Sequence, residues 1–132
     1  RSLCDWSSDV CSSDLASSAE GGGVQWFKNL GYGSFASGGN VANYDGGANW
    51  VETADLDGDG AVDLVVSSYD QASHVWYRNA GNGSAWSPEV LTAYAAGASS
   101  AEPCDLDGDG DLDVLTTSSG ANKVSWFERL GS

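Results

Sequence analysis

Short runs rich in Val, Leu, Trp and Tyr alternate with Gly-rich polar turns along the chain. These runs have the length and the β-branched and aromatic content of strands. Apolar residues fall on both alternating sets of positions, as in Val75-Trp76-Tyr77, which is typical of a sheet buried on both faces. The predicted strands span residues 24–29, 41–44, 50–54, 62–68, 74–79, 89–94, 100–104, 112–118 and 123–129. The pattern predicts an all-β fold.

The strand pattern repeats with a period of fifty residues and needs no gap. Trp26, Trp76 and Trp126 occupy equivalent positions, and Leu15-Ala16-Ser17 is equivalent to Val65-Val66-Ser67. Four short strands in roughly forty to fifty residues are typical of one β-propeller blade. The chain is therefore expected to hold about two four-stranded blades plus partial ones, as a piece of a longer array.

Between the first and second strand of each unit lies an Asp-rich motif, which occurs twice. Loop 1 (residues 55–63) reads Asp-Leu-Asp-Gly-Asp-Gly-Ala-Val-Asp, and loop 2 (residues 105–113) reads Asp-Leu-Asp-Gly-Asp-Gly-Asp-Leu-Asp. Ca²⁺ takes six to eight oxygen ligands, and alternate residues of a tight loop can turn several carboxylates inward. Gly60 and Gly110 are expected at the sharp turn.

The candidate ligands are the carboxylates at loop positions 1, 3, 5 and 9 and the backbone carbonyl at position 7. They are Asp55, Asp57, Asp59, Ala61 (carbonyl) and Asp63, and equally Asp105, Asp107, Asp109, Asp111 (carbonyl) and Asp113. The motif departs from an EF-hand, because the bidentate Glu of position 12 is replaced by Val66 and Thr116. The residues that follow are strand-like, so each loop is expected to lead into a strand.

The formal net charge is −14, and nine of the 19 acidic residues belong to the two loops. Two bound Ca²⁺ would bring the charge to −10 (−14 + 4). The acidity is thus largely a ligand set. Nucleic acid is not an expected partner, because no basic patch is present to meet phosphates. No apolar run approaches the roughly 18 residues of a transmembrane helix.

Residues 1–15 differ in character from the rest of the chain. They lack the apolar core of a signal peptide, and residues 5–15 resemble one frame of a translated sequencing adapter. We therefore treat 1–15 as an artefactual or disordered segment and 16–132 as the repeat region. Cys104 then stands alone and is expected to be a small buried hydrophobe, as Ala54 is at the equivalent position.

The sequence Asp-Leu-Asp-Gly-Asp-Gly-x-x-Asp, followed by a short apolar strand and then Val-x-Trp-Tyr/Phe, resembles the FG-GAP/VCBS repeat, and the integrin α-subunit propeller uses related units. The resemblance covers residues 16–132. It implies a calcium-binding β-propeller that is secreted or at the cell surface and is involved in adhesion or ligand binding, with the loop positions given above as ligands.

The remaining candidate residues carry weaker patterns. The repeated Trp could stack on sugars, although packing within a blade is the more usual role of such a residue. His74 is the only histidine, so no Ser/His/Asp set or zinc site can be assembled.

We expect a non-enzymatic, extracellular calcium-binding module for adhesion or ligand recognition, with a structural role for calcium. Its partner would be a protein or carbohydrate that the sequence does not identify, together with further blades of the same parent chain. The alternatives are a propeller region of a secreted enzyme, such as a polysaccharide-degrading one, and a structural spacer.

Overall fold

The computed structural model describes residues 14–17, 23–43, 47–81 and 83–129, and within these ranges it contains strands and turns but no helix. The chain in these ranges accordingly has no helix that could span a membrane. The strands are β1 (Asp14–Ser17), β2 (Gly23–Gly31), β3 (Ser34–Asn43), β4 (Trp50–Ala54), β5 (Asp63–Ser68), β6 (Ser73–Asn79), β7 (Trp86–Thr92), β8 (Ala98–Cys104), β9 (Asp113–Ser118) and β10 (Lys123–Phe127).

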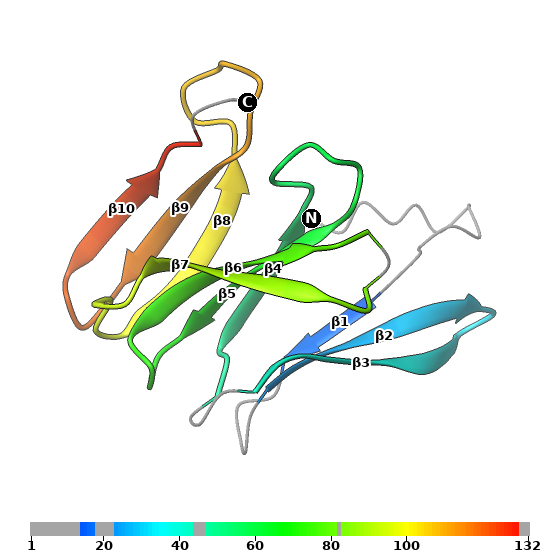
Figure 1. Ribbon diagram of the computed structural model, residues 1–132. Coiled ribbons are helices and arrows are strands. Elements are labelled where there is room, and N and C mark those ends of the chain that lie inside the picture. Colours follow the sequence, from blue (N-terminus) through cyan, green and yellow to red (C-terminus); the bar gives the residue numbers. More distant parts are fainter. Residues whose placement is uncertain (1–13, 18–22, 44–46, 82, 130–132) are drawn as a thin grey trace.

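These strands form three antiparallel sheets (Figure 1). The first sheet has the order β1-β2-β3, the central sheet β4-β5-β6-β7, and the third sheet β10-β9-β8. The described residues thus contain one four-stranded and two three-stranded sheets, whereas the sequence predicted about two four-stranded blades plus partial ones. Among the described residues, the first sheet has no strand equivalent to β4, and the third sheet has none equivalent to β7.

Strand pairing confirms the fifty-residue period. Leu15 pairs with Trp26, Val65 with Trp76, and Leu115 with Trp126. The same register therefore recurs in all three sheets, and every predicted strand is present, β4 with the predicted bounds and the others with shifted ends. β3 is the largest departure, because it begins at Ser34 rather than near Val41, and the predicted last residue, Tyr44, lies outside the described residues.

The sequence pattern missed most of β3 because its residues are small and polar rather than β-branched. Its pairing with β2 instead follows from a tight turn. Gly31, Tyr32 and Gly33 all have positive φ, of 82°, 52° and 77°. Glycine adopts this region without steric cost, so two of the three turn positions are unstrained.

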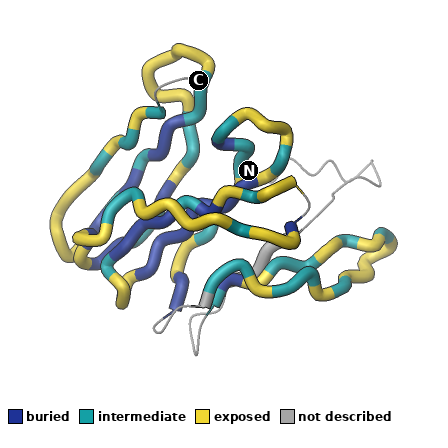
Figure 2. The backbone as a smooth tube through the Cα atoms, viewed as in Figure 1, coloured by how far each residue is buried: buried dark blue, intermediate teal, exposed yellow. Residues whose placement is uncertain are grey.

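β5 lies at the centre of the stack and all six of its residues are buried (Figure 2). Leu64 and Val66 belong to the back face of the central sheet, which packs against Val24 of the first sheet. Val65 points the other way, into the front face, where it packs against Ala101 and Val114 of the third sheet. This arrangement confirms the expectation of a sheet buried on both faces.

β1 starts at Asp14, so the last two residues of segment 1–15 belong to a strand. Residues 1–13 lie outside the described residues, and with them Cys4 and Cys11.

Cys104 is a free thiol at the end of β8 and is half-buried, so the expected full burial is not observed. Partial burial raises the pKa of this thiol, so it is protonated at neutral pH.

Candidate metal centres

Loops 1 and 2 lie at the same end of two neighbouring sheets (Figure 1). Loop 1 joins β4 to β5 and loop 2 joins β8 to β9, so each leads into a strand as predicted. Gly60 and Gly110 have φ of 90° and 98°, which confirms the turn expected there. Gly58 and Gly108 also have positive φ, so each loop reverses with the help of two glycines.

Each loop brings the carboxylates of its first three Asp residues together. One carboxylate oxygen each of Asp55, Asp57 and Asp59 lies within 4.8 Å of the others, and Asp105, Asp107 and Asp109 form the same group. Three like charges at this separation repel one another. The repulsion is reduced by backbone N–H groups that the turn points inward.

In loop 1 the N–H of Gly60 donates to Asp55 Oδ2 (2.9 Å), and the N–H of Ala61 donates to Asp59 Oδ1 (2.7 Å). Loop 2 repeats both bonds from Gly110 to Asp105 Oδ2 (3.2 Å) and from Asp111 to Asp109 Oδ1 (2.9 Å). These two bonds are thus common to both loops, and loop 2 adds a third, from the N–H of Gly108 to Asp105 Oδ1 (2.8 Å).

One oxygen of loop 1 shows that the donor set fits a hard cation. Asp55 Oδ1 is buried and has no hydrogen-bond partner among the described residues. A buried carboxylate oxygen without a partner is costly, and a cation bound by the three carboxylates would satisfy it. An all-oxygen ligand set is the type that Ca²⁺ prefers. The carbonyl ligands predicted at Ala61 and Asp111 stay a prediction.

The position 9 carboxylates, Asp63 and Asp113, are 0 % and 1 % exposed and do not belong to the three-carboxylate groups. Asp63 Oδ2 accepts hydrogen bonds from the N–H of Leu56 (3.3 Å) and from Trp76 Nε1 (3.0 Å), and its Oδ1 accepts one from the N–H of Asn79 (2.8 Å). Asp63 thereby ties the start of loop 1 to β6. Its role as a cation ligand stays a prediction.

Asp113 repeats this role in loop 2. It accepts hydrogen bonds from the N–H of Leu106 (3.1 Å) and Arg129 (3.0 Å), and from the side chain of Trp126. The Arg129 N–H bond lowers the pKa of Asp113, whereas burial raises the pKa of Asp63. The Trp predicted to pack within each blade thus also holds a carboxylate in two units. A fixed spacing of 13 residues from Asp to Trp could have indicated this pairing.

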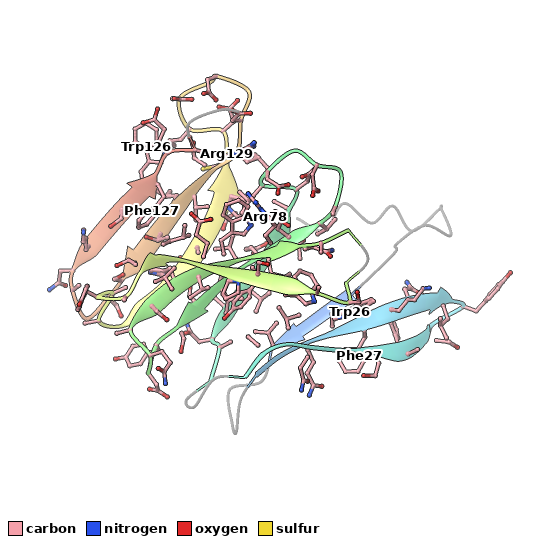
Figure 3. The ribbon with its side chains drawn as sticks, in the orientation of Figure 1. Trp26, Phe27, Arg78, Trp126, Phe127 and Arg129 are labelled. Carbon is pink, nitrogen blue, oxygen red and sulfur yellow. The ribbon has the colours of Figure 1, made fainter. Side chains whose placement is uncertain are left out.

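Two arginines that the sequence pattern did not indicate contact loop 1 (Figure 3). Arg78 Nε lies 2.8 Å from Asp57 Oδ2, and its guanidinium stacks over the Trp76 ring, 4.9 Å from the ring centroid. Arg129 donates through one terminal nitrogen to the carbonyl of Asp57 (2.8 Å) and lies 3.7 Å from Asp111 Oδ1 through the other. The contact between Arg129 and Asp57 depends on the packing of the two sheets, because the two residues are 72 positions apart in the sequence.

A cavity of about 320 Å³ opens between the central and third sheets. Its lining is mostly apolar and includes Trp76, Leu91 and Phe127, with Arg129 at its margin. It is continuous with the packing between the two sheets.

His74 lies in β6 as predicted and is completely buried. Its Nδ1 is 2.8 Å from Ser67 Oγ, and its Nε2 is 3.3 Å from Ser118 Oγ in the third sheet. The ring therefore bridges two sheets through hydroxyl groups. Burial lowers the pKa of His74 below its usual value of 6.5, so the folded protein keeps the ring neutral.

His74 is expected to lower the free energy of unfolding as the pH drops from 7 to 5. The unfolded chain takes up a proton near pH 6.5 and the folded chain does so only at lower pH, so acid favours unfolding. The loss cannot exceed about 1.4 kcal/mol per pH unit. Urea unfolding at several pH values should show this slope, and His74→Val, which installs the residue of positions 24 and 124, should remove it. An equal slope in both proteins would contradict the assignment.

The family comparison agrees with the repeat geometry. The model of the FG-GAP-like repeat matches residues 8–66 and 55–116, so its two matches overlap across loop 1. The first match begins inside segment 1–15. No curated protein and no solved structure matches the chain. Because the matches span most of the sequence, including both Asp-rich loops and the strands around them, the chain belongs to the FG-GAP-like repeat family.

Proposed function

We propose that this chain is a calcium-stabilised β-propeller module that acts in adhesion or ligand recognition outside the cell. Each Asp-rich loop would bind one Ca²⁺, and the cation would have a structural role. The observation that carries the proposal is the converging carboxylate group of each loop, together with the unsatisfied, buried Asp55 Oδ1. Nine acidic residues gathered in two loops are costly without a cation between them.

The extracellular placement is part of this proposal and rests on the FG-GAP/VCBS resemblance. Extracellular calcium modules commonly bind with a Kd of roughly 10⁻⁴–10⁻³ M. Sites of this strength fill at the calcium concentration outside cells, which is about 1 mM, and stay largely empty at much lower concentrations. A calcium-dependent module of this kind would gain its stability where the cation is abundant.

The propeller arrangement is supported by the outward face of the third sheet. On the front side of the central sheet lie Leu56, Val65, His74 and Trp76. Their equivalents fifty residues later, on the outward side of the third sheet, are Leu106, Leu115, Val124 and Trp126. Leu56 is 2 % exposed but Leu106 is 48 % exposed, and His74 is 0 % exposed but Val124 is 67 % exposed. A further sheet of the same repeat would cover this face as the third sheet covers the central one.

Calcium is expected to raise the melting temperature of the full chain by about 3–10 °C. At about 1 mM Ca²⁺ each site contributes on the order of 0.4–1.4 kcal/mol, which two sites double. Differential scanning fluorimetry in 1 mM CaCl₂ and in EGTA measures the shift.

The matched control is the double variant Asp59→Ala with Asp109→Ala, which removes one carboxylate from each cluster and leaves the Asp57–Arg78 pair in place. In EGTA this variant should melt close to the unmodified protein or slightly above it, because charge repulsion is reduced. Its melting temperature should not respond to calcium. A full calcium response in the double variant would refute these loops as the binding sites.

A further inference from the structure

Two of the five basic residues in the sequence converge on one residue of loop 1. Arg78 pairs with the carboxylate of Asp57, and Arg129 donates to its carbonyl. Figure 3 shows both side chains directed toward the Asp-rich loops. The Asp57 side chain is 13 % exposed, so its pairing with Arg78 is more shielded than a typical surface ion pair.

Loop 2 lacks this arrangement although its backbone is equivalent. The N–H of Asn79 donates to Asp63 and the N–H of Arg129 donates to Asp113, so the chain occupies the same place in both units. The residue equivalent to Arg78 is Glu128. Within the described part of the chain, no basic side chain forms an ion pair with Asp105, Asp107 or Asp109.

The two loops also differ in their own charge. Position 7 is Ala61 in loop 1 and Asp111 in loop 2, so loop 1 carries four carboxylates and loop 2 carries five. Arg129 lies 3.7 Å from the extra carboxylate of Asp111, with both side chains partly exposed. Calcium affinity follows the charge and rigidity of the ligand set. The guanidinium of Arg78 therefore reduces the negative charge of the three-carboxylate group in loop 1. Within the described residues, no basic side chain does the same for the three-carboxylate group of loop 2.

We propose that Arg78 is the internal counter-ion of loop 1, and that it makes loop 1 the weaker of two unequal calcium sites, so that loop 2 fills first. This inference rests on the proposed calcium function. Arg78 neutralises Asp57 while the loop is empty and repels the cation that enters. A single charge about 6 Å from a divalent cation, in a water-like dielectric and at physiological salt, changes affinity by about 3–10-fold.

The two sites can be followed separately in the full chain by titrating CaCl₂ and recording backbone amide NMR shifts. The amides of Gly60 and Gly110 bond to the first carboxylate of loop 1 and loop 2, so each reports its own loop. The variants Asp59→Ala and Asp109→Ala identify the two resonances, since each silences one loop. The Gly110 resonance is expected to move at lower calcium than the Gly60 resonance.

Arg78→Gln should then lower the calcium midpoint of Gly60 by about 3–10-fold and leave that of Gly110 unchanged. Glu128→Arg is the reciprocal exchange and should raise the midpoint of Gly110. Because Arg78 is half-exposed, its replacement should leave the fold intact, and the remaining amide resonances check this.

Equal midpoints in the unmodified protein, or a Gly60 midpoint that Arg78→Gln does not change, would overturn the role of Arg78 while leaving the calcium function standing. If neither glycine resonance responds to calcium, the calcium function and the role of Arg78 are both refuted.

Discussion

Replacing Asp63 with alanine is expected to lower the free energy of unfolding by about 2–4 kcal/mol even when calcium is absent. The variant leaves three donors without their acceptor: the N–H groups of Leu56 and Asn79, and Nε1 of Trp76. A buried donor that loses its partner costs roughly 1–3 kcal/mol, and part of the loss is recovered where water enters. Urea unfolding in EGTA measures the effect without any contribution from a bound cation.

The matched control is Asp59→Ala, because Asp59 lies in the same loop and is the exposed member of its three-carboxylate group. We expect this variant to leave stability in EGTA nearly unchanged and to reduce only the response to calcium. Asp63→Asn, which keeps one acceptor oxygen, should fall between the two. If Asp63→Ala and Asp59→Ala had equal effects in EGTA, Asp63 would not have the structural role described above.

Leu56→Ala is expected to destabilise the protein by about 2–4 kcal/mol, whereas Leu106→Ala should change stability by less than about 1 kcal/mol. The two leucines occupy equivalent positions fifty residues apart, but Leu56 is 2 % exposed and Leu106 is 48 % exposed. Deleting a buried leucine side chain loses its transfer free energy and leaves a cavity. Denaturant unfolding of both variants under the same conditions provides the comparison.

Similar losses in the two variants would mean that the face carrying Leu106 is covered in solution. Sedimentation of the unmodified chain would then identify the cover, since a second copy of the chain would double the mass. A stability that is insensitive to Leu106→Ala is the expected result.

The strands and their register followed from local pattern. β-branched and aromatic runs predicted β5, β6 and β9, and the fifty-residue spacing of Trp26, Trp76 and Trp126 predicted that equivalent strands would pair alike. Both signals depend on residue type and spacing, which a sequence displays directly. Most of β3 was not predicted, because its residues are mainly small and polar. Its pairing with β2 follows from a turn with positive φ and not from an apolar face.

The candidate sites were predicted less completely. The motif identified the converging carboxylates of each loop and counted Asp63 among the ligands, but it did not indicate that Asp63 is buried while Asp57 is only partly so. Burial separates them, and burial depends on β6 lying across the start of the loop. The contact between Arg129 and loop 1 joins residues 72 positions apart, so only the packing of two sheets creates it.

The double burial of β5 has a consequence for how such arrays change length. The central sheet presents one apolar face to the first sheet and another to the third. Much of each face recurs fifty residues later, although Thr116 and Ser125 replace Val66 and Val75 of the back face. An unequal recombination event that adds or removes fifty codons would join a front face to a back face of similar chemistry. The gene could thus lengthen or shorten by whole units without evolving a new interface, and the loop that belongs to each unit would be carried with it.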